Sequence, residues 1–351
     1  MPHVECRTAM GVMATRTHDK LQHPSLAEIL APLSGHLAEV ERRILKQTDA
    51  FDPGVRSYVE YALDGQGKRL RPSLALLSAA ACDSALDDGS LNLGVIVELI
   101  HVATLVHDDI NDGAVIRRSK PTSNSKWGNE ISVLLGDCLF ARALQLAASY
   151  PTTEVCRCVA NATNIVCSGE ILQTQNRFNF NLSIDEYLKF IEMKTAELFA
   201  VSCELGAYLA GADDTVKFAL REYGLKLGIA YQIYDDCLDI FGQEPKAGKS
   251  LGTDLTRGKL TMPILRVIEL ASRAEREVVN AMILKNGSGS NGKDWLELFG
   301  RHRAVEYTLE ATQKYIQQAL DALSAVPASE SQEKLVALAE FVSEQTRAIS
   351  P

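Results

Sequence analysis

The segment Leu188–Leu209, LKFIEMKTAELFAVSCELGAYL, repeats large apolar side chains at helical intervals of three, four and seven residues. This spacing places one apolar stripe along a helix that packs against a core. The rest of the chain shows the same pattern, with 11 prolines in 351 residues and none between Thr152 and Glu244. No stretch alternates apolar and polar residues between turn signals, as a half-buried strand would. The sequence therefore predicts an all-α fold.

Runs rich in glycine, aspartate, asparagine and serine interrupt the helical pattern and mark turns between helices. These runs are Leu86–Ser90, Ser149–Glu154, Gly211–Thr215, Gln243–Ser250 and Asn286–Lys293. No change of composition marks a domain boundary after Lys20. We therefore predict one domain, a single large helical bundle over residues 21–351, preceded by a disordered lead-in over residues 1–20. Met10 and Met13 are alternative starting points.

The composition narrows the class of protein. The formal net charge of −9 argues against wholesale nucleic-acid binding. No uncharged apolar run reaches the ~18 residues that a membrane span needs, and the first twenty residues lack the apolar stretch of a signal peptide. The eight cysteines are scattered, as expected for reduced thiols, and we predict a cytoplasmic protein without a transmembrane segment. Cys156 and Cys158 could form half of a metal site, but no second pair or histidine lies at zinc spacing.

Two aspartate-rich motifs carry the strongest chemical signal. The first is DDxxD at Asp108, Asp109 and Asp112, at the end of an apolar run. On a helix, Asp108 and Asp112 lie on one face, where like charges repel unless a cation offsets them. Carboxylate oxygens suit Mg²⁺, which shares its remaining ligands with water and phosphate. A single copy also occurs on solvated helices and is weak evidence alone.

A second copy strengthens this interpretation. Asp235, Asp236 and Asp239 repeat the spacing within AYQIYDDCLDIFG, which is too apolar for a solvated face. Two carboxylate faces at the ends of apolar helices indicate a central cavity that holds a metal–diphosphate group. The pair Asp213–Asp214 lacks the third acid and is instead typical of a helix start.

Basic residues near the first motif could bind the diphosphate. Arg117 and Arg118 follow that motif, and adjacent guanidinium groups suit bidentate contacts to phosphate. Lys68 and Arg71 lie three residues apart in a glycine loop, and Pro72 suits the first turn of the helix that follows. For each pair the alternative is an ordinary solvated surface.

Other candidates are single residues. Lys194 and Thr195 fall within a predicted helix, and Lys249 and Lys259 follow the second motif. His101 lies two helical turns before the first motif on the same face, where a core histidine is the alternative. Each of these residues would be unremarkable alone, but together they would place further positive charge around a phosphate.

In this order, the motifs resemble those of the trans-isoprenyl diphosphate synthases of long-chain type. The matching segments are GKRLRP (67–72), HDDIND with its arginine pair (107–118), GD (136–137), GEILQ (169–173), KTAELF (194–199) and YQIYDDCLDIFG through GKSLGTDL to GKLTMP (231–263). They cover most of the domain and are highly specific in combination. The resemblance implies an isoprenoid synthase-like helical bundle that acts as a homodimer.

The resemblance also implies a role for each matching residue. Asp108 and Asp112, with Asp109 beside them, would hold Mg²⁺ on the allylic diphosphate. Asp235 would hold another Mg²⁺, and Asp236 and Asp239 would act less directly. These six acids and Lys194 would form the catalytic set, with three Mg²⁺ ions per active site. The allylic diphosphate would contact Arg117, Lys194, Thr195, Gln232, Lys249 and Lys259. Isopentenyl diphosphate would contact Lys68, Arg71, His101 and Arg118.

The implied reaction is a Mg²⁺-dependent condensation of isopentenyl diphosphate with an allylic diphosphate. Metal ions and cationic side chains draw charge onto the leaving diphosphate, so that the allylic C–O bond breaks. The isopentenyl double bond attacks the allylic cation, and a proton is then lost, with the departed diphosphate as one candidate base. The apolar helices exclude water, which would otherwise quench the cation.

Side chains upstream of the first motif bear on product length. Ala103 and Thr104 lie five and four residues before Asp108, where an aromatic residue would stop the growing chain. Both are small, which predicts an open tunnel and an all-trans polyprenyl product longer than C20. Another helix would set the floor, around Ile165–Leu172. A farnesyl or geranylgeranyl diphosphate synthase is the alternative within the family.

Two positions depart from the family pattern, and rival functions remain. Ser119 and Gln66 stand where glycines are usual, although neither change removes a charged ligand. A class I terpene cyclase would have a different second metal motif and would need no isopentenyl site. A catalytically silent partner subunit of a heteromeric synthase should lack some of these acids or arginines. A nucleotidase would need a P-loop, but Gly242–Ser250 has five residues between its glycines where such a loop has four.

Overall fold

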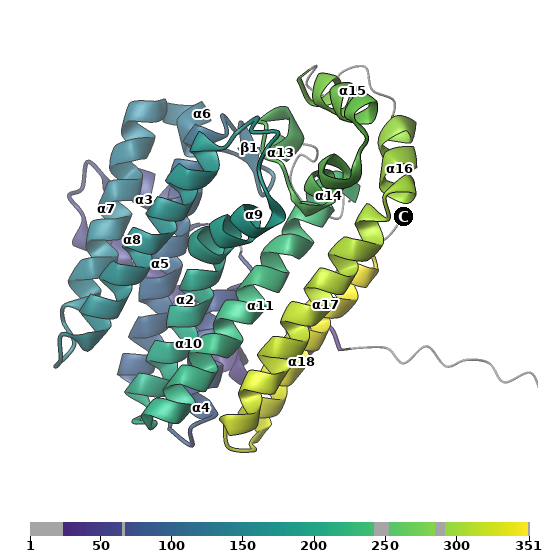
Figure 1. Ribbon diagram of the computed structural model, residues 1–351. Helices are drawn as coiled ribbons and strands as arrows, with labels where there is room; N and C mark the ends of the chain where they lie inside the picture. The colour runs from purple at the N-terminus through teal and green to yellow at the C-terminus, as the bar shows by residue number, and fades with distance from the viewer. Residues whose placement is uncertain (1–23, 65–66, 242–252, 285–291, 350–351) are drawn as a thin grey trace, which may run out of the picture.

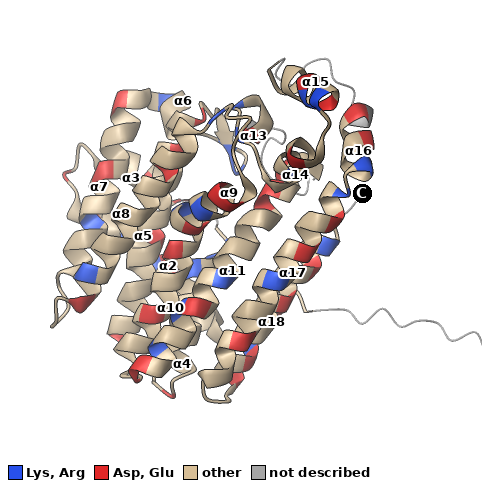
Figure 2. Cartoon of the chain, in the orientation of Figure 1, with Lys and Arg blue, Asp and Glu red and all other residues tan. Residues whose placement is uncertain are grey.

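The computed structural model describes residues 24–64, 67–241, 253–284 and 292–349, which form an all-α bundle as predicted. Short elements, namely α6, α9, α13, α14 and the hairpin at β1, gather at one end of the long helices (Figure 1). The helices α17 and α18 carry acidic and basic residues along their length (Figure 2). The predicted lead-in and the loop that contains Lys249 lie outside the described residues.

The elements follow one another in this order: α1 (Leu26–Leu30), η1 (Ala31–Leu33), α2 (Ser34–Lys46), η2 (Gln47–Ala50), α3 (Arg56–Leu63), α4 (Leu70–Ala80), α5 (Asp88–Asn111), β1 (Ile116–Arg117), β2 (Lys120–Pro121), α6 (Ser123–Trp127), α7 (Asn129–Ala147), α8 (Glu154–Gln175), α9 (Ile184–Ile191), η3 (Glu192–Ala196), α10 (Glu197–Leu209), α11 (Asp214–Phe241), α13 (Thr253–Thr256), α14 (Met262–Leu270), α15 (Arg273–Leu284), α16 (Gly292–Arg301), α17 (Ala304–Ala322), η4 (Leu323–Ala325) and α18 (Glu330–Arg347).

Two hydrophobic cores run through the bundle and share the long helix α11. The first packs α4, α5, α10 and the first half of α11 around buried residues such as Ile96 and Phe199. The second joins α9, the second half of α11 and α14 around residues such as Ile233 and Leu265. Each such side chain contributes about 1.5–3 kcal/mol when fully buried. The end of α11 that carries the second acidic motif is therefore fixed by a core of its own.

The start of α11 confirms the interpretation of the acidic pair that lacks a third acid. The carboxylate of Asp213 accepts a hydrogen bond from the Val216 backbone nitrogen at 2.9 Å, and Asp214 begins the helix. Acids at this end of a helix favour the positive end of its dipole. This pair stabilises a helix start and takes no part in the cavity described below.

The segment Leu188–Leu209 differs from the expectation of one continuous α-helix. It runs from α9 through a π-helical turn, Glu192–Ala196, into α10. π turns contain one residue more than an α turn and often occur at functional sites. Periodicity alone did not predict the turn, because the apolar stripe continues on both sides of it.

A small hairpin interrupts the helical pattern after the first acidic motif. β1 and β2 pair antiparallel, with Ile116 opposite Pro121 and Arg117 opposite Lys120. The turn residues Arg118 and Ser119 have φ of 50° and 62°, a left-handed conformation that glycine adopts more easily. Strands of two residues are too short to show an alternating pattern, so the hairpin was not predicted.

α5 is long and apolar enough to cross a membrane by length and composition, and 72% of that stretch is buried inside the bundle. Its residues Ile96, Leu99 and Ile100 are at most 1% exposed. The burial is that expected of a central core helix, and α5 ends where the first acidic motif faces the cavity.

Candidate active site

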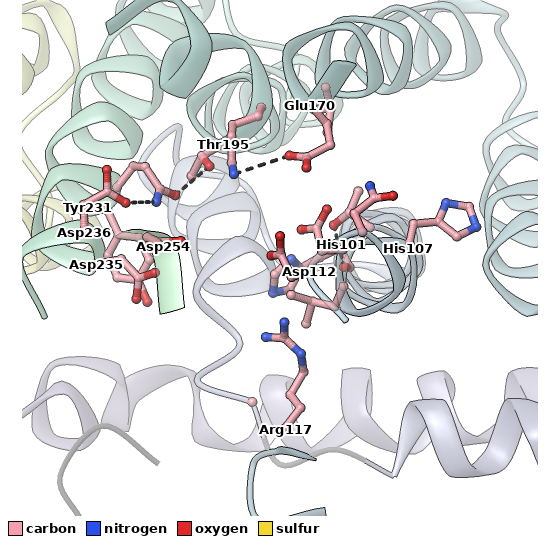
Figure 3. A pocket seen from close by; sticks show the side chains of 18 of the residues that line it. His101, His107, Asp112, Arg117, Glu170, Thr195, Tyr231, Asp235, Asp236 and Asp254 are labelled. Carbon is pink, nitrogen blue, oxygen red and sulfur yellow. Dashed lines mark hydrogen bonds and ion pairs between the residues drawn. The ribbon is translucent and has the colours of Figure 1, made fainter. Parts of the chain in front are cut away.

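One cavity of about 1050 Å³ brings together nearly all of the predicted site residues. Figure 3 shows Asp235, Asp236 and Asp254 on one side of it and Asp112 with Arg117 on another. The predicted residues that line the cavity are Lys68, Arg71, His101, Thr104, Asp108, Asp112, Arg117, Arg118, Lys194, Thr195, Gln232, Asp235, Asp236, Asp239 and Lys259. Asp109 and Ala103 are not among the lining residues, and Lys249 lies outside the part of the chain described.

The first acidic motif is held by ion pairs. Asp112 accepts from Lys259 Nζ at 2.8 Å and from Arg177 Nη2 at 3.0 Å. Burial would raise the pKa of the Asp112 carboxyl, but Lys259, together with Lys194 and Arg177, outweighs burial, so the pKa lies below its ordinary value. Asp109 is buried and pairs with Arg117 Nε at 2.7 Å. The carboxylates of Asp112 and Asp109 therefore form ion pairs with cationic side chains of the protein itself.

Asp108 is the acid of this motif whose negative charge is least offset by neighbouring cations. Burial, and then the nearby Glu170 carboxylate, raises the pKa of Asp108 to about 6. A raised carboxyl pKa means that the surroundings disfavour its negative charge. A divalent cation at this position would stabilise the ionised form.

In the second acidic motif, Asp236 and Asp239 accept hydrogen bonds from neutral donors. The Asp236 carboxylate accepts from Tyr187 Oη at 2.6 Å and from Gln232 Nε2 at 2.7 Å. The Asp239 carboxylate accepts from the Asp254 backbone nitrogen at 3.1 Å. Burial raises the pKa of Asp236 to about 6 even with these hydrogen bonds. The buried surroundings of Asp236 therefore disfavour its negative charge, which a bound cation would stabilise.

Asp254 is an acid of this region to which the sequence reasoning gave no role. It lines the cavity from α13, and burial followed by Asp239 and Asp236 raises its pKa to about 7. Lys259 Nζ lies 4.0 Å from its carboxylate. Asp254 belongs to the matched segment GTDL, so the motif carried the signal, but its spacing from the second motif did not reveal the contact.

The π-helical turn presents two consecutive residues to the cavity. Lys194 Nζ donates to Gln173 Oε1 at 2.7 Å and lies 3.4 Å from Glu170. Thr195 Oγ1 donates to Gln232 Oε1 at 2.8 Å. Burial lowers the pKa of Lys194, but the surrounding carboxylates, Glu170 and Asp108 first among them, outweigh burial and raise it above its ordinary value. Lys194 is therefore a permanently charged group between α8 and the acids.

Two glycines allow helices to approach this turn closely. A Cβ added at Gly169 of α8 would lie 2.6 Å from the Lys194 backbone nitrogen. A Cβ added at Gly228 of α11 would lie 2.6 Å from the Ala196 Cα. Neither contact is possible for a larger residue without a backbone shift. The packing explains why the matched segment GEILQ begins with glycine.

Positive charge is concentrated at the predicted isopentenyl site. Arg71 is half-buried, its guanidinium lies 4.8 Å from the Phe199 ring centre, and its buried Nε has no hydrogen-bond partner among the described residues. Burial, and then Arg71 and Arg118, holds the pKa of His101 well below its ordinary value. His101 is therefore neutral, and the surrounding arginines are available to an anion.

Arg69 anchors the loop that carries Lys68 and Arg71. Its guanidinium pairs with the buried Glu98 of α5 at 2.5 Å and with Glu41 of α2 at 2.6 Å. Its backbone has φ of 49°, just before α4 begins. The sequence analysis did not predict this role, because nothing in the basic run Lys68–Arg71 indicates that Arg69 pairs with acids while its neighbours face the cavity.

The two predicted chain-length residues have different environments. Thr104 lines the cavity, whereas Ala103 is fully buried in the first hydrophobic core. Val166 and Ile171 of α8 also line the cavity, within the region where a tunnel floor was predicted. A growing chain would therefore meet Thr104 and α8 directly, and would reach Ala103 only if the wall moved.

Comparison with known proteins identifies the family. A sequence model described as polyprenyl synthetase matches residues 52–296. The chain belongs to this family. The octaprenyl diphosphate synthase of Haemophilus influenzae is 32% identical over 315 residues, which cover 90% of this chain and 95% of that protein. The corresponding protein of Escherichia coli is 30% identical over 311 residues, covering 89% and 96%.

Solved structures of polyprenyl synthases have the same fold. The decaprenyl diphosphate synthase from Rhodobacter capsulatus superposes with a TM-score of 0.85 at 34% identity, covering 92% of this chain and 100% of that one. A polyprenyl synthase from Caulobacter crescentus, complexed with calcium and isoprenyl diphosphate, gives a TM-score of 0.85 at 35% identity, covering 92% and 98%. The predicted resemblance to long-chain trans-isoprenyl diphosphate synthases is thus confirmed.

Proposed function

We propose that this protein is a Mg²⁺-dependent trans-prenyltransferase that adds isopentenyl diphosphate to an allylic diphosphate and makes a polyprenyl diphosphate longer than C20. Its long-chain relatives support the reaction and the product class. The observation that carries the assignment of residues is the cavity itself. Five of the six acids of the two motifs, all but Asp109, line one space together with the predicted cationic residues; Lys249 lies outside the described residues.

The residues fit a divalent metal shared with diphosphate. The donors are hard carboxylate oxygens from two facing helices, and the raised pKa values of Asp108, Asp236 and Asp254 mark negative charge in excess. Among the described residues, no three acids, histidines or cysteines lie close enough to hold a metal by themselves. Such a site suits Mg²⁺, which takes part of its ligands from substrate phosphate and water. Bound there, the ions would neutralise charge on the leaving diphosphate.

Asp108 and Asp112 would hold metal from one side and Asp235 from the other. Lys259 and Arg117, which now pair with acids, would turn to the allylic diphosphate, and Lys194 would join them. These cations stabilise the departing diphosphate as it takes the electron pair of the C–O bond. The number of Mg²⁺ ions that we propose is three per site.

The cationic pocket formed by Lys68, Arg71, His101 and Arg118 would hold isopentenyl diphosphate. The guanidinium of Arg71 lies over the Phe199 ring, so it is oriented before the substrate arrives. The new bond would form between the allylic carbon and the isopentenyl double bond, and the departed diphosphate, the candidate base, would take the proton that is lost. The apolar walls, which include Val166 and Ile171, would keep water from the cation.

We also propose a homodimer in the cytoplasm. Large apolar side chains are exposed on α7, with Leu134 60% and Val133 43% exposed. Exposed apolar groups of this size favour burial against a partner. Light scattering on the purified protein should give twice the chain mass of 38.3 kDa, and a monomer would contradict the proposal.

The reaction is tested by product analysis. Purified protein, Mg²⁺ and labelled isopentenyl diphosphate would be incubated with farnesyl or geranylgeranyl diphosphate, and the products sized by chromatography. We expect chains longer than C20. Products that stop at C15 or C20 would favour the shorter-chain synthase, and a lack of condensation by folded protein would favour a silent partner subunit.

A matched pair of variants tests the chain-length assignment. Thr104→Phe places a ring in the cavity, so the product should become shorter while the protein remains stable. Ala103→Phe instead overpacks the core and should cost about 1–3 kcal/mol of unfolding free energy. Chromatography of products and thermal unfolding measure the two effects, and an unchanged product from Thr104→Phe would show that the wall lies elsewhere.

A further inference from the structure

Tyr187 of α9 contacts the second acidic motif without belonging to any catalytic motif. Its side chain is 1% exposed within the second hydrophobic core. Its hydroxyl donates a hydrogen bond of 2.6 Å to Asp236 Oδ2. Because Tyr187 is not among the residues that line the cavity, it cannot touch a substrate there. The hydrogen bond to Asp236 is the contact by which Tyr187 reaches the second acidic motif.

The second oxygen of Asp236 is also held. Gln232 Nε2 donates to Asp236 Oδ1 at 2.7 Å, and Gln232 Oε1 accepts from Thr195 Oγ1 at 2.8 Å (Figure 3). A continuous chain of hydrogen bonds therefore joins the π-helical turn, α11 and α9. Each donor is neutral, so this chain fixes the direction of the carboxylate without cancelling its charge.

The neutrality of these donors matters for a cation site. An ion pair would compete with a metal for the carboxylate, whereas a neutral hydroxyl or amide donor leaves the charge available to a cation. Groups that hydrogen-bond a metal ligand from behind commonly set its orientation and the affinity of the site. The Tyr187 hydroxyl lies in this position relative to the second acidic motif.

We propose that Tyr187 is a positioning residue, which orients Asp236 so that the second acidic motif binds a divalent cation together with diphosphate. The inference rests on the proposed function, because it presumes a metal–diphosphate group between the two motifs. It extends that function to a residue outside the matched motifs.

The test uses Tyr187→Phe, which removes one oxygen atom and retains the ring. Binding of Mn²⁺ in the presence of inorganic diphosphate would be followed by electron paramagnetic resonance. We expect affinity for Mn²⁺ to fall about 10- to 100-fold. The Mg²⁺ concentration for half-maximal activity should rise, whereas KM for isopentenyl diphosphate, measured at saturating Mg²⁺, should stay unchanged.

Tyr223→Phe is the matched control. Tyr223 lies on α11, is fully buried and donates a hydrogen bond of 2.6 Å to the Leu335 backbone oxygen. Its loss should lower the temperature of unfolding as the loss of any buried hydrogen bond does, with no change in Mn²⁺ affinity. An equal loss of Mn²⁺ affinity in both variants would show a general structural effect and overturn the proposal.

Asp236→Asn supplies a second, independent test. If Tyr187 acts through Asp236, adding Tyr187→Phe to Asp236→Asn should change Mn²⁺ affinity by less than about twofold. Wild-type affinity in Asp236→Asn alone would refute the proposal even if Tyr187→Phe did not fold. If the wild-type protein itself bound no Mn²⁺ with diphosphate, the proposed function would fail first. Wild-type binding with unchanged affinity in Tyr187→Phe would reject this inference alone.

Discussion

The two acidic motifs have the same spacing but are held in opposite ways. In the first, Asp112 and Asp109 pair with the cations Lys259, Arg177 and Arg117. In the second, Asp236 and Asp239 accept from a phenol, an amide and a backbone nitrogen. The first motif can exchange these cations for metal, whereas the Asp236 carboxylate of the second motif is oriented by two neutral donors. The same DDxxD spacing thus occurs in two different electrostatic environments.

The largest predicted effect is the loss of catalysis when either motif loses an acid. Asp108→Ala and Asp235→Ala should each lower kcat by at least about 10²–10³-fold, because each removes charge that holds metal on the leaving group. Steady-state kinetics at saturating substrates would measure the effect, and circular dichroism would check the fold. Wild-type activity in both variants would contradict the assignment of Asp108 and Asp235 as metal ligands.

A substrate-specific effect should distinguish the cations of the two subsites. Lys259→Gln should raise KM for the allylic diphosphate, and Lys68→Gln should raise KM for isopentenyl diphosphate. Loss of one charged hydrogen bond of about 1.5–3 kcal/mol corresponds to about 10- to 100-fold. Lys226→Gln is the control, because Lys226 pairs with Glu222 on α11 and does not line the cavity. Equal changes in both KM values would contradict the division of the cavity.

The pH dependence of stability should report the excess charge near Asp108. Its pKa of about 6 in the folded protein exceeds the ordinary 3.8, so the folded state binds more protons between these values. Metal-free protein should therefore lose stability as pH rises through about 4 to 7 and regain it as pH falls. Asp108→Asn removes this term and should be more stable than wild type at pH 7.5, by roughly 1–3 kcal/mol.

Chemical denaturation at pH 5 and pH 7.5 would measure this effect. Wild type and Asp108→Asn should differ less at pH 5 than at pH 7.5, since the carboxyl is then protonated in the folded state. A wild-type protein that is more stable than Asp108→Asn at pH 7.5 without metal would show that Asp108 already has a stabilising partner.

The smallest predicted effect concerns the hairpin that supplies Arg117 to the first motif. Ser119 is exposed with φ of 62°, and a left-handed residue with a Cβ costs about 1–2 kcal/mol. Ser119→Gly should raise the free energy of unfolding by about 0.5–1 kcal/mol, after the greater freedom of glycine in the unfolded chain is counted. Ser119→Ala keeps the Cβ and should not raise the free energy of unfolding. Equal stabilities of the two variants would contradict the proposed backbone strain at Ser119.

The sequence predicted the parts of this site that depend on local spacing. Asp108, Asp112 and Asp235 share helix faces that open into one cavity, and apolar periodicity identified the helices around them. Lys194 and Thr195 were also found, although the π-helical turn that presents both was not. Helical spacing alone cannot reveal a turn that depends on close approach of two other helices.

The residues that the sequence analysis did not predict make contacts with residues far from them in the sequence. Glu170 and Tyr187 lie in or near matched segments, but their contacts with Lys194 and Asp236 depend on how α8 and α9 pack. Ala103 was placed on the tunnel wall by its distance from Asp108, and the structure buries it in the core instead. Side-chain direction at that turn depends on neighbouring helices, which spacing does not describe.

A crystal structure with Mg²⁺ and an unreactive thio analogue of the allylic diphosphate would test the central claim most directly. The account predicts a diphosphate between Asp108 and Asp235, with Lys259 moved from Asp112 onto phosphate and Asp236 still bonded to Tyr187. A diphosphate bound elsewhere in the cavity, or Lys259 still paired with Asp112 beside a bound diphosphate, would contradict it.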